Sequence, residues 1–260
     1  MRTGGHDARP DAKRRRLPRC GAAVAVSLIG ALLSACSPLN ALNVFVPSDS
    51  YTLTDGAAYG DGPRRRLDIY RPVAGTNPAA GPVLVFFYGG SWKSGARGQY
   101  RFVGDAFARL GYTVVIPDYR LYPEVRFPGF MEDAAAAIAW TVRNLADAGG
   151  RRLPLFLMGH SAGAHIAALA AVDPRYLAAH DLTPARLCGV VGMAGPYAFD
   201  PLAYRSTRAV FAGLADPDEA RPVKRIAAEG IPPFLLLHGA EDGTVKPFNT
   251  TEFAAALRSA

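Results

Sequence analysis

The chain has 260 residues, and 50% of them are hydrophobic, which is enough for one large domain with a buried core. Its formal net charge is +7, but residues 1–36 carry +5 of this charge and residues 37–260 carry only +2. Because no basic stripe with interleaved aromatic residues follows residue 36, the charge does not indicate a nucleic-acid-binding protein.

The first 36 residues have the pattern of an export signal. Basic residues precede an uncharged apolar run of 13 residues, Gly21 to Leu33, too short to span a bilayer about 30 Å thick as a helix. The run ends in Leu33-Ser34-Ala35-Cys36, which resembles the lipobox of bacterial lipoproteins. The resemblance implies a signal peptide over residues 1–35 and a lipid anchor on Cys36. An ordinary signal peptide with an incidental cysteine is the alternative.

The residues around the lipobox extend this interpretation. Ser37, rather than Asp, follows the cysteine, which in lipoproteins implies sorting to the outer membrane of the bacterial cell envelope, facing the periplasm. Arg14 to Leu17 only weakly resembles a twin-arginine signal, so the export route, Sec or twin-arginine, stays open. We expect residues 36–50 to form a tether and residues 51–260 to form the folded domain. Cys188 is the single cysteine of the domain, residues 51–260, and its apolar neighbours predict a buried strand position.

Predicted strands and helices alternate through the mature chain. Apolar runs predict strands at Leu67–Tyr70, Val83–Tyr88, Thr113–Ile116, Leu153–Met158, Leu187–Met193 and Phe234–Leu237. Helical spacing predicts helices at Tyr100–Leu110, Pro128–Leu145, Ala162–Ala171 and Phe248–Leu257. Buried strands separated by helices form parallel sheets with right-handed crossovers, so we predict an α/β fold with helices on both faces of a mostly parallel sheet. Residues 196–230 interrupt the alternation and are expected to form a lid-like insertion at the ligand-binding edge of the sheet.

The sequence Gly159-His160-Ser161-Ala162-Gly163 lies between a predicted strand and a predicted helix. This G-x-S-x-G arrangement is typical of a nucleophile elbow, a turn so sharp that side chains at the glycine positions would collide with the neighbouring strand and helix. The turn exposes the Ser161 hydroxyl and leaves the N–H of Ala162 free to bind an oxyanion. The pattern therefore predicts a catalytic serine, with an incidental Gly-Ser turn as the alternative.

Three further motifs follow predicted strands. They are Tyr88-Gly89-Gly90-Ser91-Trp92, the segment Asp118 to Glu124, and the segment His238 to Val245. With the elbow, they resemble the motifs of the α/β-hydrolase fold. Within that fold the chain resembles small bacterial esterases related to the hormone-sensitive-lipase, feruloyl-esterase and kynurenine-formamidase groups. The resemblance covers about residues 60–260.

The resemblance implies an oxyanion hole. In those esterases the first motif is H-G-G-x-W, so the amides of Gly89 and Gly90 are implied to complete the hole with Ala162. Glycine is needed there because bare backbone must approach the substrate oxygen. Tyr88 replaces the usual histidine, which holds this loop in place in those esterases. Here either the phenol of Tyr88 holds the loop or no side chain at this position does. A strand-end turn with no catalytic role is the alternative for the two glycines.

The other two motifs supply carboxylates. The resemblance implies that Asp242 is the acid of a catalytic triad, which orients the histidine and stabilises the imidazolium. Its neighbour Glu241 is the competing candidate. We expect Asp118 and Arg120 to be structural and to pin the loop after their strand.

The chain order of this fold is serine, acid, histidine, but no histidine follows Asp242. The five histidines are His6, His160, His165, His180 and His238. We expect His160 to point away from the nucleophile, and the last four to be structural. The expected explanation is a sequence that lacks the final strand and helix together with the catalytic histidine. A pseudoenzyme that lost its base is the alternative.

The sequence therefore predicts a serine hydrolase that cleaves a small-molecule carboxylic ester through an acyl-enzyme on Ser161. The alternatives are a catalytically dead lipoprotein with this fold, and a peptidase or amidase of the same fold. The aromatic residues of the insertion either face the substrate or form a small core of their own. No metal cluster, phosphate loop or dinucleotide fingerprint occurs in the sequence, so we expect no cofactor.

Overall fold

The computed structural model describes residues 1, 38–73, 81–146, 150, 152–227 and 229–260. Cys36 and the apolar run before it lie outside the described residues. By its internal contacts the chain divides into Met1–Ala41 and Leu42–Ala260, and the second unit contains the sheet. In the described part of the chain, no helix is long and apolar enough to cross a bilayer.

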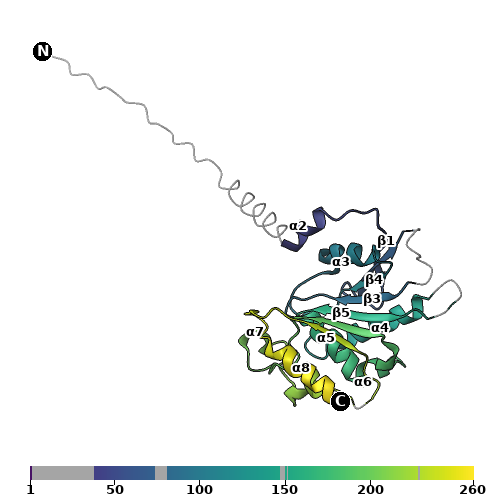
Figure 1. Ribbon diagram of the computed structural model, residues 1–260. Helices are drawn as coiled ribbons and strands as arrows, with labels where there is room; N and C mark the ends of the chain where they lie inside the picture. Colours follow the sequence, from purple (N-terminus) through teal and green to yellow (C-terminus); the bar gives the residue numbers. More distant parts are fainter. Residues whose placement is uncertain (2–37, 74–80, 147–149, 151, 228) are drawn as a thin grey trace. The chain divides into compact units, whose positions relative to one another are not determined.

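A seven-stranded sheet with the order β1-β2-β4-β3-β5-β6-β7 forms the centre of the domain (Figure 1). The strands are β1 (Tyr51–Ala58), β2 (Arg66–Pro72), β3 (Val83–Phe87), β4 (Thr113–Pro117), β5 (Leu155–His160), β6 (Gly189–Met193) and β7 (Phe234–Leu237). β2 pairs antiparallel with both β1 and β4, whereas the pairs from β4 to β7 are all parallel. The predicted α/β fold with a mostly parallel sheet is confirmed.

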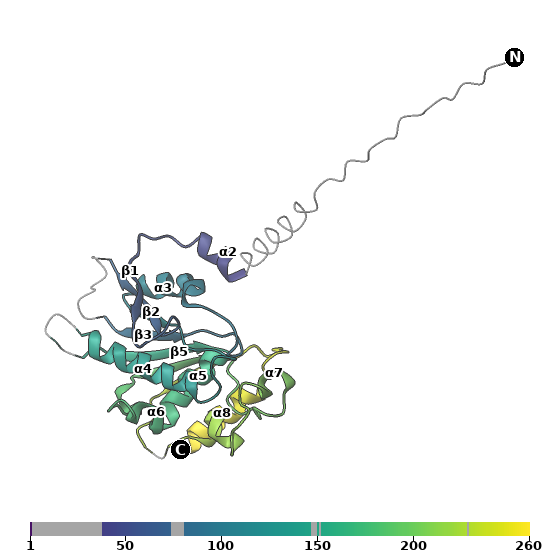
Figure 2. The same cartoon turned by 180° about the vertical axis from the view of Figure 1, so that it is seen from behind.

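Helices cover both faces of the sheet. α3 (Arg101–Ala108) lies on one face, and α4 (Gly129–Asn144) and α5 (Ala162–Val172) lie on the other (Figure 1 and Figure 2). The remaining helices are α2 (Pro38–Val44), α6 (Pro174–Ala178), α7 (Arg205–Arg208) and α8 (Phe248–Ser259), with short 3-10 turns η1 (Arg97–Tyr100), η2 (Pro184–Arg186), η3 (Pro217–Ala220) and η4 (Pro222–Lys224).

The core lies between the central strands and the helices beside them. All five residues of β3 are buried, and so is every residue of α5. Most residues of α5 are alanine or glycine, so this helix can approach the sheet closely. Burial of each large apolar side chain in the strands stabilises the fold by about 1.5–3 kcal/mol.

Three features differ from the sequence-based expectations. β1 was not predicted, because only Tyr51 of its eight residues is buried. The predicted burial of Cys188 is wrong, since this cysteine is exposed and precedes β6. The predicted tether contains α2, and the Asn43 side chain of that helix donates to the Gly98 carbonyl at 2.8 Å and accepts from the Phe102 N–H at 3.2 Å.

Candidate active site

Ser161 lies in the turn between β5 and α5, with φ 53° and ψ −119°, a backbone conformation that L residues rarely adopt. The flanking glycines make this turn possible. A Cβ on Gly159 would lie 2.2 Å from the Gly163 carbonyl oxygen, and a Cβ on Gly163 would lie 2.0 Å from the Phe87 carbonyl oxygen. The Ser161 N–H donates to the Met193 carbonyl at 2.8 Å. The predicted strand–turn–helix geometry is therefore present, with the turn fastened to β6.

The loop after β3 lies beside this turn. A Cβ on Gly89 would lie 3.1 Å from the Cβ of Ser161. Gly90 has φ 129°, and a Cβ there would lie 2.1 Å from the Ser94 carbonyl oxygen, so only glycine fits. The Gly90 carbonyl accepts from the N–H groups of Lys93 and Ser94 at 2.9 and 3.1 Å. The loop is tight, and it brings bare backbone next to the serine.

The three predicted oxyanion-hole amides are not equivalent. Ala162 is the first residue of α5, so its N–H has no acceptor within the helix. Burial raises the pKa of Tyr100, and the neighbouring Gly89 backbone opposes this shift. The oxyanion-hole roles of Gly89, Gly90 and Ala162 remain predictions.

A cavity of about 310 Å³ opens beside Ser161 and Ala162. Its other walls come from the loop after β3, from the insertion and from residues 243–246. Some aromatic residues of the insertion face the cavity, and others form a small core, so both expected arrangements occur. Phe199 and Tyr204 line the cavity, whereas Phe211 is fully buried, with its ring centroid 4.9 Å from that of Trp92.

The carboxylate of Asp242 is fixed in the loop after β7. Its Oδ1 accepts from the backbone N–H groups of Thr244 and Val245 at 2.8 and 2.9 Å. Hydrogen bonds from Val245 and Thr244 lower the pKa of Asp242, so it stays ionised. Its Oδ2 lies 3.5 Å from Nε2 of His238. The neighbouring Glu241 is exposed. This arrangement suits an orienting carboxylate, although the triad role of Asp242 remains a prediction.

Two histidines are held as structural residues, as predicted. His165 is fully buried, its Nε2 lies 2.7 Å from the Ala220 carbonyl, and desolvation lowers its pKa to about 4. This bond ties the insertion to α5. His238 has Nδ1 at 2.6 Å from the Thr250 hydroxyl and Nε2 at 2.8 Å from the Val245 carbonyl. These contacts fix the orientation of both rings.

His160 borders the loop after β3, because its Nδ1 lies 3.0 Å from where a Cβ on Gly89 would be. It is not among the residues that line the 310 Å³ cavity, and whether it points away from the nucleophile stays a prediction. Desolvation lowers the pKa of His160, and the charge of Asp242 opposes this shift. His180 lines a different cavity, with Tyr176 and Phe127.

The described residues do not complete a triad. Among them, no hydrogen bond joins the Ser161 hydroxyl to a histidine ring. Nor do they bring together three His, Cys, Asp or Glu side chains that could hold a metal ion. The site within the described part thus holds a serine, backbone amides and a carboxylate.

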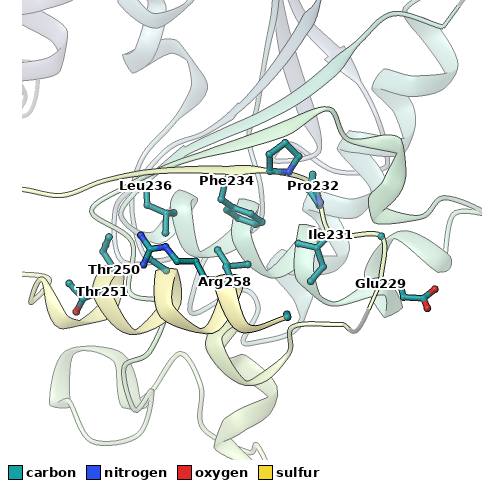
Figure 3. Close-up of a pocket in the computed structure, with 13 residues that line it drawn as sticks. Glu229, Ile231, Pro232, Phe234, Leu236, Thr250, Thr251 and Arg258 are labelled. Atoms are coloured by element: carbon teal, nitrogen blue, oxygen red, sulfur yellow. The ribbon is translucent and has the colours of Figure 1, made fainter.

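A larger cavity, of about 850 Å³, lies between β7 and α8 and does not include Ser161 (Figure 3). Apolar side chains line much of it, among them Ile231, Phe234 and Leu236. β7 is the last strand in the sheet order, and its Leu235 and Leu237 are 55% and 48% exposed. This end of the sheet is therefore open in the described part of the chain.

The segment Asp118 to Glu124 is structural, as predicted. The Arg120 side chain donates to Asp133 of α4, from Nε to Oδ2 at 2.8 Å and from Nη2 to Oδ1 at 2.9 Å, and its backbone N–H donates to Oδ2 at 2.9 Å. Asp118 accepts from Nη1 of Arg97 at 2.7 Å. No motif in the sequence indicates Arg97 or Arg64, which belong to the same network. The signal of Arg64 is a run of three arginines at residues 64–66.

The mostly parallel sheet, the elbow after β5 and the carboxylate loop after β7 define a domain of the α/β-hydrolase class. Solved structures share this fold. The apo form of Thermogutta terrifontis esterase 2 is 26% identical, with a TM-score of 0.66 over 83% of this chain and 82% of that one. An inhibited esterase B from Lactobacillus rhamnosis is 22% identical, with a TM-score of 0.70 over 91% of this chain and 82% of that one.

Residues 67–257 match the BD-FAE family, and the chain belongs to that family. It is 34% identical over 223 residues to esterase LipC of Mycobacterium tuberculosis, covering 77% of this chain and 54% of the relative. It is 30% identical over 224 residues to isoprenylcysteine alpha-carbonyl methylesterase ICME of Arabidopsis thaliana, covering 77% of this chain and 51% of the relative. The chain thus spans about half the length of these curated relatives.

Proposed function

We propose that this protein hydrolyses carboxylic esters of small molecules through an acyl-enzyme on Ser161. The observation that carries the proposal is the strained turn that presents Ser161 to a cavity of about 310 Å³, beside Ala162 and the glycine loop after β3. Membership of the BD-FAE family and similarity to proteins named as esterases support the same chemistry.

The chemistry follows from these groups. Ser161 Oγ attacks the ester carbonyl carbon and gives its proton to a histidine base, and the N–H groups of Gly90 and Ala162 stabilise the oxyanion that forms. The intermediate then expels the alcohol, which takes that proton, and the acyl group stays on Ser161. Water, deprotonated by the same base, releases the carboxylic acid. The ionised Asp242 orients the base and stabilises its imidazolium form.

We propose that the base is a histidine outside these 260 residues, on a segment that pairs with the open edge of β7. Two observations support this proposal. Leu235 and Leu237 are exposed at that edge, and the cavity beside α8, lined in part by apolar side chains, is open (Figure 3). A further strand and helix would cover both, and would bring a side chain to the carboxyl edge of the sheet, where Asp242 lies.

Hydrolysis of p-nitrophenyl acetate by the product of the complete gene tests the function. We expect Ser161→Ala to lose at least about 10³-fold in kcat/KM, as removal of a catalytic nucleophile does. Ser259→Ala, the same change at an exposed serine of α8, should keep wild-type activity. Equal activity of Ser161→Ala and wild type would refute the proposal. The 260-residue chain alone should keep only the small rate that an oxyanion hole provides without a base.

A non-catalytic binding protein is the second candidate, favoured by the lack of a base near Ser161 among the described residues. It predicts that the product of the complete gene binds ester analogues in the cavity without turnover.

Replacing the ester by an aminoacyl amide in the same assay tests the peptidase or amidase alternative.

We also propose that Cys36 is lipidated and anchors the domain to the outer membrane. This proposal rests on the lipobox-like sequence, since Cys36 lies outside the described residues. Two acyl chains would hold the protein stably, because each buried CH₂ contributes about 0.8 kcal/mol. Radiolabelled palmitate should enter the wild type and not Cys36→Ser, and the wild type should fractionate with membranes. Label in Cys36→Ser, or a wholly unbound wild type, would exclude the anchor.

A further inference from the structure

Tyr88 stands at the base of the predicted oxyanion loop, directly before Gly89. It is fully buried, and its ring stacks between two others, with centroids 4.8 Å from Tyr119 and 5.4 Å from Tyr100. Packing on both faces fixes the ring, so the phenol hydroxyl is held in one place.

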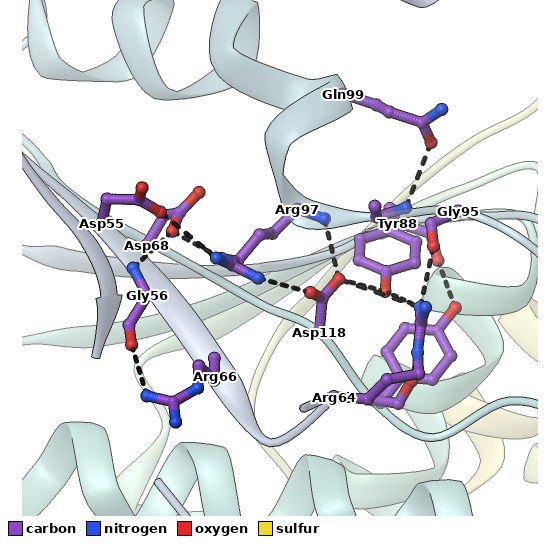
Figure 4. A network of polar contacts seen from close by, with 12 residues as sticks. Asp55, Gly56, Arg64, Arg66, Asp68, Tyr88, Gly95, Arg97, Gln99 and Asp118 are labelled. Atoms are coloured by element: carbon purple, nitrogen blue, oxygen red, sulfur yellow. Dashed lines mark hydrogen bonds and ion pairs between the residues drawn. The ribbon is translucent and has the colours of Figure 1, made fainter. Parts of the chain in front are cut away.

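The Tyr88 hydroxyl joins a network of charged side chains (Figure 4). It donates to Oδ1 of Asp118 at 2.7 Å and accepts from Nη2 of Arg64 at 2.9 Å. Burial, with Tyr119 and Asp118 nearby, raises the pKa of Tyr88, so the hydroxyl keeps its proton and can donate. A hydrogen bond to a carboxylate is shorter and stronger than one between neutral groups.

Asp118 is itself immobilised. Arg97 donates to it twice, from Nη1 to Oδ2 at 2.7 Å and from its backbone N–H to Oδ1 at 2.8 Å. Nε of Arg97 also donates to Asp68 at 2.6 Å. Asp118 and Asp68 are only 5% and 4% exposed, and burying a carboxylate is costly unless a cation faces it, as the Arg97 guanidinium faces both. The acceptor of the Tyr88 proton is therefore a fixed point (Figure 4).

Arg64 binds the two ends of the loop together. Its Nη2 donates to the Gly95 carbonyl at 2.8 Å as well as to Tyr88. Its Nε donates to the Tyr119 carbonyl at 2.9 Å, and the Tyr119 hydroxyl donates back to the Tyr88 carbonyl at 2.8 Å. The segment from Tyr88 to Gly95, which contains Gly90, is thus closed by one guanidinium group.

We propose that Tyr88 is a positioning residue for ester hydrolysis: its hydroxyl, held between Asp118 and Arg64, sets where the Gly90 amide meets the oxyanion. The inference rests on the proposed function. Tyr88 acts through the loop and does not touch the substrate. Loss of its hydroxyl therefore weakens the binding of the transition state more than the binding of the ester.

Tyr88→Phe in the product of the complete gene removes the hydroxyl and keeps the stacked ring. Loss of a whole oxyanion-hole donor lowers kcat by about 10²–10³-fold, and a displaced donor costs less. We therefore expect kcat for p-nitrophenyl acetate to fall about tenfold while KM changes less than about twofold. A trifluoromethyl ketone, which adds to the serine and forms an oxyanion, should bind weaker by about the same factor.

Tyr70→Phe is the matched control, because Tyr70 is also buried (1% exposed), its ring packs against Gly104, and it forms no hydrogen bond to Asp118 or Arg64 in the described structure. It should leave kcat and inhibitor binding unchanged. Arg64→Gln removes the guanidinium group that donates to both Tyr88 and Gly95, so it should lower kcat and weaken inhibitor binding as Tyr88→Phe does. If Tyr88→Phe does not fold, the result for Arg64→Gln tests the inference in its place.

Unchanged kcat and inhibitor binding in folded Tyr88→Phe would overturn the inference, as would an equal loss in Tyr70→Phe. Ser161→Ala, assayed beside them, separates the two proposals. If Ser161→Ala is inactive and Tyr88→Phe is unchanged, only this inference fails. If Ser161→Ala is as active as the wild type, the proposed function fails.

Discussion

The nucleophile side and the acid side of the site are built differently. Ser161 is held by packed backbone, between two glycines that admit no Cβ and ahead of a helix, α5, in which every residue is buried. Asp242 is held by two hydrogen bonds within its own loop, after a strand in which intermediate and exposed residues alternate. The turn of the serine is therefore fixed by tight packing within this chain, whereas the loop of the acid is held mainly by its own hydrogen bonds.

The largest difference in stability between the two sides is expected from a glycine-to-alanine substitution, which adds one methyl group. Gly163→Ala places a Cβ 2.0 Å from the Phe87 carbonyl oxygen, and should lower the free energy of unfolding by about 3 kcal/mol or more. Gly239→Ala, in the loop of the acid, meets nothing within 4 Å and should be neutral or stabilise by up to about 1 kcal/mol. Urea unfolding of both variants measures this, and equal effects would contradict the comparison.

His165 should make the nucleophile side sensitive to acid. Desolvation lowers its pKa from 6.5 to about 4 in the folded protein, against the opposing bond to Ala220. Between about pH 6.5 and pH 4 the histidine is protonated in the unfolded chain but not in the folded protein. The free energy of unfolding therefore falls as the pH drops through this range, by about 3 kcal/mol in total. Unfolding free energies at pH 7, 5.5 and 4.5 test this. His165→Gln should flatten that part of the profile, and an identical profile in the variant would refute the assignment.

Leu235 tests whether the acid side is completed by a further segment. In the 260-residue chain this residue is 55% exposed, so Leu235→Ser should change the free energy of unfolding by less than about 0.5 kcal/mol. In the product of the complete gene the same change should cost about 1–2 kcal/mol, because the leucine would be covered. A small effect in both proteins would argue against the segment proposed to pair with β7.

The smallest effect is expected where the loop after β3 meets the insertion. Nζ of Lys93 donates to the carbonyl of Ser206, which lines the cavity. Lys93→Met removes one exposed hydrogen bond, worth about 0.5–1 kcal/mol, and should raise KM for a bulky ester about threefold without changing kcat. Lys224→Met, at another exposed lysine, is the control. A fall in kcat would show that Lys93 has another role.

The parts of the fold that the sequence predicted are those specified locally. The elbow was predicted because its glycines and the apolar run before them lie within a few residues of Ser161. β1 was missed because pairing with β2, and not its own pattern, makes it a strand, and because a register shift between Thr54 and Ala57 interrupts it. The error at Cys188 has a related cause, since an apolar run does not reveal where its strand begins.

The same division applies to the site. Ser161 and Asp242 could be proposed from short motifs, but the partners of Tyr88 could not, because Asp118 is 30 residues away and Arg64 is 24 residues away. The sequence showed only that a phenol replaces a histidine. Which groups hydrogen-bond to this phenol depends on how β3, β4 and the turn before β2 meet in the fold, and the spacing of residues in the sequence does not encode that arrangement.

The exposed leucines of β7 also affect how the 260-residue chain behaves in solution. An edge strand with unpaired backbone groups and apolar side chains is a template on which a second chain can add. Because β7 ends the sheet with Leu235 and Leu237 about half exposed, chains purified at high concentration should associate edge to edge. Their sedimentation should then depend on concentration, and a charged residue at position 235 should make the sample easier to keep in solution.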